Sequence, residues 1–359
     1  MTNQGSNSKS LRCNNRRVIL WKLFNNGPMS RVELAKECRL TGAAITIIVK
    51  ELLESGKIIE NGQRLQRNHQ GRKEVLLDLN YNEYLACNIN IERDNIHFSL
   101  CSLKGIVFKS IKPTKEMMGI EYLRINIERI TRGYEHRLVG IGIGVTGAVD
   151  EQSGELVNSY GLFPNGLNIK EELGRYFQVP IYVANNVRAQ AMAIISMDNR
   201  NFLYIKHGPG VGCAIVINGK VLNGHTNKAG EMSQVRISCA SDKLEDYLKE
   251  DELLAKTHFS TTKELYAAYR VNKQATEVLD ECILTMAYCV INMNKLIDPE
   301  KIILGGGFFY SQLIYEELYK KLCEIDSEAA EKVELLSEEV NIKSIASARL
   351  VFNKVFFEA

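Results

Sequence analysis

The sequence lacks the features that mark several large classes of protein. Its nine cysteines include no C-x-x-C pair, which argues against a zinc ribbon and against a disulfide framework. It has no run of 18 apolar residues, as a membrane-spanning helix would need, and residues 1–9 are polar, unlike a signal peptide. We therefore expect a cytoplasmic protein with reduced cysteines and no membrane partner.

The chain also carries little net charge, +2 over 359 residues, but this charge is unevenly distributed. Residues 1–80 contain 14 Lys and Arg against 7 Asp and Glu, whereas the remaining residues contain 31 against 36. The length suggests two or three domains, and a hydrophobic content of 45% is ordinary for a globular protein. A basic N-terminal domain on an acidic body indicates a polyanionic partner at the N-terminal end.

Three short helices are predicted within this basic region. The first spans residues 11–26, where apolar side chains recur at helical spacing. Ser30 then offers an N-cap and Glu33 completes a capping-box pattern, which predicts the start of a second helix. Thr41 is the expected N-cap of a third helix that ends near Ser55. The second and third helices, joined by a turn of about four residues, are typical of a helix-turn-helix.

The outward face of the third helix carries small and hydroxylated side chains, which suit close approach to the major groove of DNA. Two strands, residues 57–59 and 75–77, then flank a basic loop and predict a winged variant of this fold. The residues expected to contact DNA are Ser30, Arg31, Thr41, Gly42, Ala43, Thr46, Lys50 and Arg72. A three-helix protein-interaction module is the alternative, but the basic charge favours double-stranded DNA as the partner.

From about residue 85 the pattern changes to strands that alternate with helices, and several strands end at glycines. This pattern predicts an α/β protein with ligand-binding loops at the carboxyl ends of its strands. Glycine-rich stretches at residues 208–212 and 305–307 suit backbone contacts to phosphates. Each stretch alone is as typical of a tight turn as of a nucleotide site.

Several segments together resemble the ROK family (repressors, open reading frames and sugar kinases), in its repressor branch of xylose-type and N-acetylglucosamine-type repressors. These segments are residues 7–12, 30–35, 71–72, 144–150, 179–186, 229–231 and 298–307. The resemblance implies an α/β fold in which a winged helix-turn-helix precedes a two-lobed, actin-like or hexokinase-like domain. The expected boundaries are 1–80 for the DNA-binding domain, 83–190 with the C-terminal helix 345–359 for the smaller lobe, and 191–340 for the larger lobe.

The same resemblance indicates that the machinery of a sugar kinase is incomplete here. Where such kinases carry a Glu-Asn-Asp triplet, the chain has Ala184-Asn185-Asn186, and an amide cannot act as a general base at neutral pH. The matching phosphate turn carries Glu92 and Asp94, whose carboxylates would repel a triphosphate. Because phosphoryl transfer depends on positioning and electrostatics, we expect a degenerate kinase that is not an enzyme.

The family's zinc site is also expected to be absent. Gln234 stands where a zinc-binding His is usual, and only Cys239 is retained of three cysteines. No metal and no other cofactor is therefore expected. Amides and carboxylates can still hold the vicinal hydroxyls of a sugar through hydrogen bonds. By resemblance, the sugar-binding residues are Asn185, Asn186, Glu231, Gln234 and Glu245.

These observations predict a DNA-binding transcriptional regulator, a repressor of carbohydrate-utilisation genes with a small sugar or sugar phosphate as its effector. It would bind an inverted-repeat operator as a homodimer or a tetramer, because paired half-sites call for twofold symmetry in the protein. Two alternatives stay open. One is a residual sugar kinase with a DNA-binding head, and the other is a regulator with an empty cleft that a protein partner controls.

Overall fold

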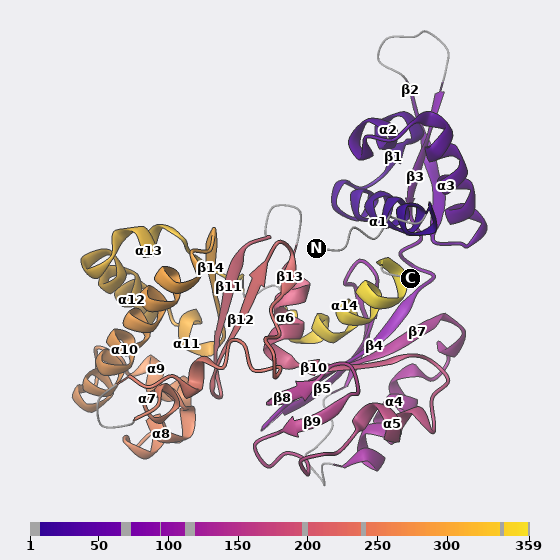
Figure 1. Ribbon diagram of the computed structural model, residues 1–359. Helices are drawn as coiled ribbons and strands as arrows, with labels where there is room; N and C mark the ends of the chain where they lie inside the picture. The colour runs from indigo at the N-terminus through magenta and orange to yellow at the C-terminus, as the bar shows by residue number, and fades with distance from the viewer. Residues whose placement is uncertain are drawn as a thin grey trace.

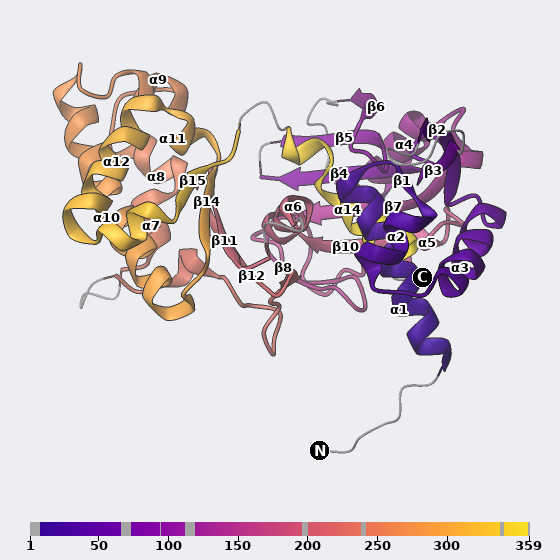
Figure 2. The same ribbon diagram turned by 90° about the horizontal axis from the view of Figure 1, so that it is seen from above.

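The computed structural model describes residues 8–65, 73–93, 95–111, 119–195, 200–237, 242–337 and 341–357. The chain forms an N-terminal head and two α/β lobes, each built on a five-stranded sheet (Figure 1). The head lies over the smaller lobe and the larger lobe lies beside it, as the view from above also shows (Figure 2). The predicted mixed α/β architecture is therefore confirmed.

The head combines helices with a three-stranded sheet. Its elements are α1 (Ser8–Asn26), β1 (Met29–Ser30), α2 (Arg31–Cys38), α3 (Gly42–Glu54), β2 (Ile58–Leu65) and β3 (Lys73–Leu79). Strand β3 lies between β1 and β2 and pairs antiparallel with both. This is the predicted winged helix-turn-helix, with β2 and β3 as the wing.

Local hydrogen bonds define where α2 and α3 begin. The Ser30 hydroxyl accepts a hydrogen bond from the N–H of Glu33 (3.3 Å), and the Glu33 carboxylate accepts one from the N–H of Ser30 (2.8 Å). The Thr41 hydroxyl accepts one from the N–H of Ala44 at the start of α3 (3.3 Å). Arg39, which ends α2, has φ 54°, the left-handed conformation that glycine usually supplies there. The capping signals of the sequence therefore determine the turn between the two helices.

The smaller lobe follows the head. Its elements are β4 (Leu85–Glu92), β5 (Asn95–Ser102), β6 (Val107–Ile111), α4 (Ile120–Thr131), η1 (Glu135–Arg137), β7 (Leu138–Val145), β8 (Ala148–Asp150), β9 (Glu155–Asn158), α5 (Ile169–Gly174), β10 (Ile181–Asn185) and α6 (Asn186–Ile194). The main sheet has the order β10-β7-β4-β5-β6, in which β10, β7 and β4 are parallel. Helix α6 runs across residue 190, the expected boundary between the lobes.

The larger lobe is built on the sheet β13-β12-β11-β14-β15. Its elements are β11 (Phe202–His207), β12 (Val211–Ile217), β13 (Lys220–Val221), η2 (Met232–Gln234), α7 (Leu244–Leu248), α8 (Glu250–Ala255), α9 (Thr262–Ala267), α10 (Lys273–Ile297), β14 (Lys301–Gly305), α11 (Gly307–Tyr310), α12 (Gln312–Ile325), α13 (Ser327–Glu331) and β15 (Val333–Leu335). No helix in the described part of the chain combines the length and the apolarity needed to cross a lipid bilayer.

The last elements return to the smaller lobe, as predicted for the C-terminal helix. They are η3 (Ile342–Ser344), α14 (Ala346–Phe352) and the π-helical segment η4 (Asn353–Phe357). Helix α14 lies directly on β7 because alternate residues of that strand are glycines: a Cβ at Gly140 or Gly142 would overlap Val351 or Ser347. The buried Asn88 side chain accepts a hydrogen bond from the N–H of Ser347 (2.7 Å) and orients the start of the helix.

The hydrophobic core of the head continues into the smaller lobe through α14 and η4. One cluster of buried side chains joins residues of α1, α2 and α3 to Ala86 of β4 and to Val351 of α14. Trp21 of α1 stacks on Phe357 of η4, with ring centroids 4.6 Å apart. In Figure 1, α14 (yellow) runs between the head and the sheet of the smaller lobe. The head is therefore packed against this lobe and shares its core.

Candidate functional site

Two adjoining cavities lie between the lobes, near the carboxyl ends of β7, β10 and β11. The inner cavity has a volume of about 100 Å³ and the outer cavity a volume of about 330 Å³. Hydroxyl, amide and carboxylate groups dominate the polar lining of the inner cavity, from Thr146, Tyr160, Asn185, Asn186, Glu231 and Ser233. Such groups form hydrogen bonds with polyols.

The two asparagines at the start of α6 have different surroundings. Asn185 is the N-cap of α6: its side-chain oxygen accepts two backbone N–H groups of that helix, and its Nδ2 donates to the carbonyl of Gly147 (2.8 Å). One N–H of this amide is left for a ligand. Asn186 is 3% exposed, and its Nδ2 donates to the hydroxyl of Thr146 (3.3 Å). Asn186 can bind a sugar hydroxyl, but it cannot take its proton.

Glu231 and Tyr160 face each other across the cleft. The Tyr160 hydroxyl donates a hydrogen bond to Oε2 of Glu231 (3.2 Å), which joins the smaller lobe to the larger. Burial, together with the Glu231 carboxylate, raises the pKa of Tyr160 to about 12, so its hydroxyl remains a donor at neutral pH. Tyr160 was not among the residues expected from the sequence. Its φ of 51° is rare for a bulky residue and marks a constrained turn before Gly161.

The other two predicted sugar ligands lie further out. Glu245, at the start of α7, lines the outer cavity and forms an ion pair with Lys243 (3.6 Å). Gln234 lines neither cavity, and its side-chain amide donates to the hydroxyl of Ser233 (3.3 Å). The predicted residues that the inner cavity brings together are Asn185, Asn186 and Glu231.

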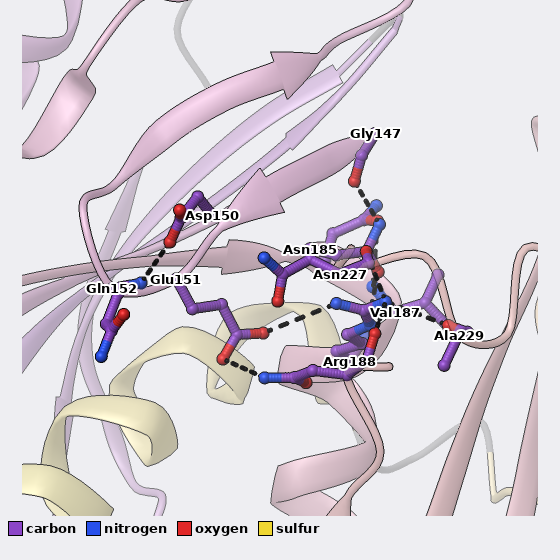
Figure 3. A network of polar contacts seen from close by, with 11 residues as sticks. Gly147, Asp150, Glu151, Gln152, Asn185, Val187, Arg188, Asn227 and Ala229 are labelled. Atoms are coloured by element: carbon purple, nitrogen blue, oxygen red, sulfur yellow. Dashed lines mark hydrogen bonds and ion pairs between the residues drawn. The ribbon is translucent and has the colours of Figure 1, made fainter. Parts of the chain in front are cut away.

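A buried arginine holds the loop that leads to Glu231. Arg188 of α6 donates to the backbone carbonyls of Asn227 (2.8 Å) and Ala229 (3.0 Å) and pairs with Glu151 at 3.9 Å (Figure 3). Burial lowers the pKa of Arg188, and burial raises the pKa of Glu151 even though Arg188 opposes this. These contacts of Arg188 were not expected from the sequence, because backbone carbonyl acceptors leave no signal in a sequence.

Glu92, an acid of the expected phosphate turn, lies in a cluster of ion pairs. Glu92, at the end of β4, pairs with Lys206 of β11 (3.0 Å) and with Lys343 of η3 (2.7 Å). Burial alone would raise the pKa of Glu92, but the two lysines lower it to about 2. Burial also lowers the pKa of Lys206. The cluster therefore joins the two lobes directly. Asp94, the other acid of the expected phosphate turn, lies outside the described residues.

The predicted DNA-contacting face of α3 is open to solvent. Its exposed residues are Thr41, Gly42, Ala43, Thr46 and Lys50. Lys50 pairs with Glu54 at 3.8 Å, and Arg31 of α2 pairs with Glu60 at 3.6 Å. Exposed ion pairs of this kind contribute little to stability, so both cations can exchange these partners for DNA phosphates.

Ser30 was expected at the DNA interface, and the structure corrects this expectation. It is 2% exposed, pairs with Leu76 in the sheet of the head, and caps α2 with its hydroxyl. A buried hydroxyl cannot reach DNA, so the role of Ser30 is structural. Arg72, expected at the tip of the wing, lies outside the described residues.

The described residues do not fit the zinc site of the family. Gln234 stands at the position expected for a zinc-binding His, and an amide does not replace imidazole as a zinc ligand. Within the described residues, no group of three or more His, Cys, Asp or Glu side chains is placed to hold a metal ion. Cys239 lies outside the described residues.

Residues 88–341 match the ROK family. A putative xylose repressor of Caldicellulosiruptor sp. (strain Rt8B.4) is 26% identical over 344 residues, which are 85% of this chain and 86% of that protein. A solved ROK family transcriptional regulator, a homolog of the E. coli MLC protein, superposes with a TM-score of 0.80 and 21% identity over 97% of this chain and 98% of its own. A putative N-acetylmannosamine kinase from Listeria monocytogenes superposes with a TM-score of 0.65 and 17% identity over 75% of this chain and 99% of its own.

Proposed function

Since the chain belongs to the ROK family, we propose that it is a sugar-responsive DNA-binding repressor of carbohydrate-utilisation genes. Its similarity to a protein named as a putative xylose repressor, over 85% of this chain, supports this proposal. The head, residues 1–80, reads the operator with α3. The residues proposed to contact DNA are Arg31, Thr41, Gly42, Ala43, Thr46, Lys50 and Arg72.

The proposed effector site is the inner cavity between the lobes. A small sugar would form hydrogen bonds with Asn186 and Glu231, with the free N–H of Asn185 and with the hydroxyl of Tyr160. Arg188 holds the backbone of the loop before Glu231 and thereby positions this carboxylate. The groups on both lobes face the same space, so a bound sugar favours one separation of the lobes over others.

One arrangement supports the proposal: α14 packs against both the head and α6, whose first residues line the inner cavity. Near its start, Ser347 adjoins Gly144 of β7, and Gly144 also adjoins Asn186 at the start of α6. Further along, the guanidinium carbon of Arg349 lies 3.9 Å from the centroid of the Phe24 ring in α1. A sugar that shifts α6 would therefore move the surface on which the head rests. The sugar changes DNA affinity only to the extent that its own affinity differs between two arrangements of the lobes and the head.

The proposal treats the protein as a sensor that does not phosphorylate its sugar. Asn186 stands where the proton acceptor of a kinase is expected, and Glu92 with its two lysines occupies the expected phosphate region. Phosphoryl transfer needs a proton acceptor and a site for the phosphates, and both are expected to be missing here. Consumption of ATP by the purified protein with any sugar of a hexose, pentose and amino-sugar panel would contradict this part of the proposal.

The proposed functional unit is a homodimer or a tetramer on an inverted-repeat operator. This rests on symmetry: two identical half-sites are read best by two heads related by a twofold axis. A single half-site should then bind much more weakly than the full repeat in a gel-shift titration.

The single tryptophan of the chain offers a direct test of the sugar response. Trp21 lies at the junction of head and smaller lobe, so an effective sugar should change its fluorescence and weaken binding to a duplex from the protein's own promoter region. Glu231→Ala should bind this duplex normally and lose both responses to sugar. Glu277→Ala, which removes an exposed carboxylate on α10, should respond like the wild type. Failure to bind any duplex from that region, or a full sugar response in Glu231→Ala, would refute the proposal.

A further inference from the structure

We propose that the effector is an unphosphorylated saccharide of two or more units, with one unit in the inner cavity, a second in the outer cavity, and the ring of Tyr160 between them. This inference rests on the proposed function, because it specifies the ligand of the same cleft. It defines a second subsite, which the sugar ligands expected from the sequence do not account for.

The two cavities form one continuous space. They share the lining residues Thr146, Tyr160, Pro209, Gly210, Val211 and Ser233. The outer cavity is the larger, about 330 Å³ against about 100 Å³. A monosaccharide held by Asn186 and Glu231 would leave this outer space to water. A glycosidic link at the shared boundary would instead carry a second unit into it, which buries more of the ligand surface.

Tyr160 is placed to divide the space into two subsites. Its hydroxyl is held by Glu231 at 3.2 Å, so the ring has a defined position although 50% of the residue is exposed. The backbone at this residue is left-handed, with φ 51°, and the residue lines both cavities. An exposed aromatic face of this kind packs against the apolar face of a pyranose ring, and a large rigid side chain pays little entropy to do so. Leu162 adds apolar surface to the outer cavity.

The charge of the outer cavity disfavours a phosphorylated sugar. Its lining includes four carboxylates and two cations, Glu245, Asp246, Asp251, Glu252, Arg93 and Lys249. Arg93 is already paired with Asp251. A phosphate group placed there would meet an excess of negative charge, whereas neutral hydroxyl groups would find acceptors for their hydrogen bonds.

The inner end of the cleft offers no excess positive charge either. Lys206 is the cation of the inner cavity, and it pairs with Glu92 at 3.0 Å. Lys343 pairs with the other oxygen of the same carboxylate, and the Glu250 carboxyl group lies close enough to Lys206 to influence its pKa. Two cations and two carboxyl groups leave this cluster close to neutral. A phosphate would have to displace Glu92 from a buried ion pair, which is costly.

Isothermal titration calorimetry on the full-length protein tests the inference with matched pairs of sugars. The pairs are xylose with xylobiose, glucose with maltose and cellobiose, and N-acetylglucosamine with chitobiose, and glucose 6-phosphate is added as the charged probe. At least one disaccharide should bind about tenfold more tightly than its own monosaccharide, since the second unit adds the contacts of the outer cavity. Glucose 6-phosphate should bind more weakly than glucose.

Two substitutions at Tyr160 separate the stacking role from the hydrogen bond to Glu231. Tyr160→Ala should abolish the preference for the disaccharide, while Tyr160→Phe should retain most of it because the ring remains. Both variants should match the wild type in thermal unfolding, which shows that they fold. Equal binding of monosaccharides and disaccharides, tighter binding of glucose 6-phosphate, or an unchanged preference in Tyr160→Ala would overturn this inference and leave the proposed function intact. Absence of binding by every sugar would overturn both.

Discussion

Glu92, which the sequence resemblance aligns with the phosphate turn of a sugar kinase, is only 3% exposed. A carboxylate at this depth is costly to bury unless it is paired. Lys206 and Lys343 supply the pairing, from the larger lobe and from the segment before α14. At the scale of single residues, an internal ion-pair cluster therefore joins the two lobes.

Glu92→Gln should lower the free energy of unfolding by about 3 kcal/mol at pH 7, because it leaves Lys206 buried without its charged partner. The pKa of Glu92 is about 2 in the folded protein and 4.5 is its ordinary value. Its stabilisation is therefore complete above about pH 4.5 and is lost as the pH falls towards 2. Urea unfolding should show that the difference in the free energy of unfolding between wild type and variant becomes smaller as the pH falls over this range.

The control for this experiment is Glu277→Gln, which removes an exposed carboxylate that pairs with Lys273 at 3.8 Å. Its effect should stay below about 1 kcal/mol at both ends of the pH range. The assigned ion pairs would be contradicted if Glu92→Gln did not lower the free energy of unfolding at pH 7. They would also be contradicted if it lowered this free energy equally at pH 7 and pH 3.

At the scale of elements, the helix-turn-helix separates residues that build it from residues that face outward. Ser30, Glu33 and Thr41 cap its two helices, and Arg39 makes the turn in the left-handed conformation. The buried face of α3 consists of Ile45, Ile48, Val49 and Leu52. Its outward side chains carry no part of this packing, so they can be replaced without unfolding the head.

Lys50→Ala should weaken operator binding and reduce the slope of log affinity against log salt by about 1, because one phosphate contact is lost. Lys273→Ala is the matched control: Lys273 also forms an exposed pair with a Glu four residues later at 3.8 Å, but on α10 of the larger lobe. Fluorescence anisotropy at several salt concentrations measures both variants. An unchanged slope for Lys50→Ala would remove this residue from the DNA interface.

At the scale of the whole molecule, α14 and η4 unite the head with the smaller lobe. Arg349 is buried there without an ion pair in the described residues, over the rings of Phe24, Trp21 and Phe357. Burial lowers the pKa of Arg349 to about 10, so it remains charged at neutral pH. The contact of this cation with aromatic faces offsets part of its desolvation cost. The head thus shares one packed core with the smaller lobe, and α14 of this core also packs against α6, whose first residues line the cleft between the lobes.

Phe357→Ala should uncouple the head from the cleft. The variant loses the stack on Trp21, so sugar should still bind but should no longer change operator affinity. A core Phe→Ala change costs about 3–5 kcal/mol, and Phe98→Ala matches that loss. Phe98 is buried among side chains of a separate core cluster of the smaller lobe, against Tyr122 of α4. In gel shifts, sugar should still change the operator affinity of Phe98→Ala but not that of Phe357→Ala. Loss of this sugar effect in both variants would contradict a specific role for η4.

Much of the fold followed from local patterns. The capping box at Ser30 and Glu33, the alternation of strands and helices from about residue 85, and the return of the C-terminal helix are all present. Local patterns predicted only part of the candidate site. Asn186 and Glu231 lie together in one cavity, whereas Gln234 points elsewhere and Tyr160 was not foreseen. These differences depend on the direction of each side chain across the cleft, which no nearby residue encodes.

The sequence by itself determined the order of helices and strands, the basic character of the head and the amide at position 186, because these depend on residues within about one helical turn or on side-chain chemistry alone. Only the tertiary structure decided that Ser30 is buried and that Glu92 is held by two lysines from distant segments. It also decided that the last helix lies between the cleft and the head. The reason is that burial and ion pairing depend on which surfaces meet when the sheets and helices pack. The glycines of β7, for example, are required only because α14 lies directly against them.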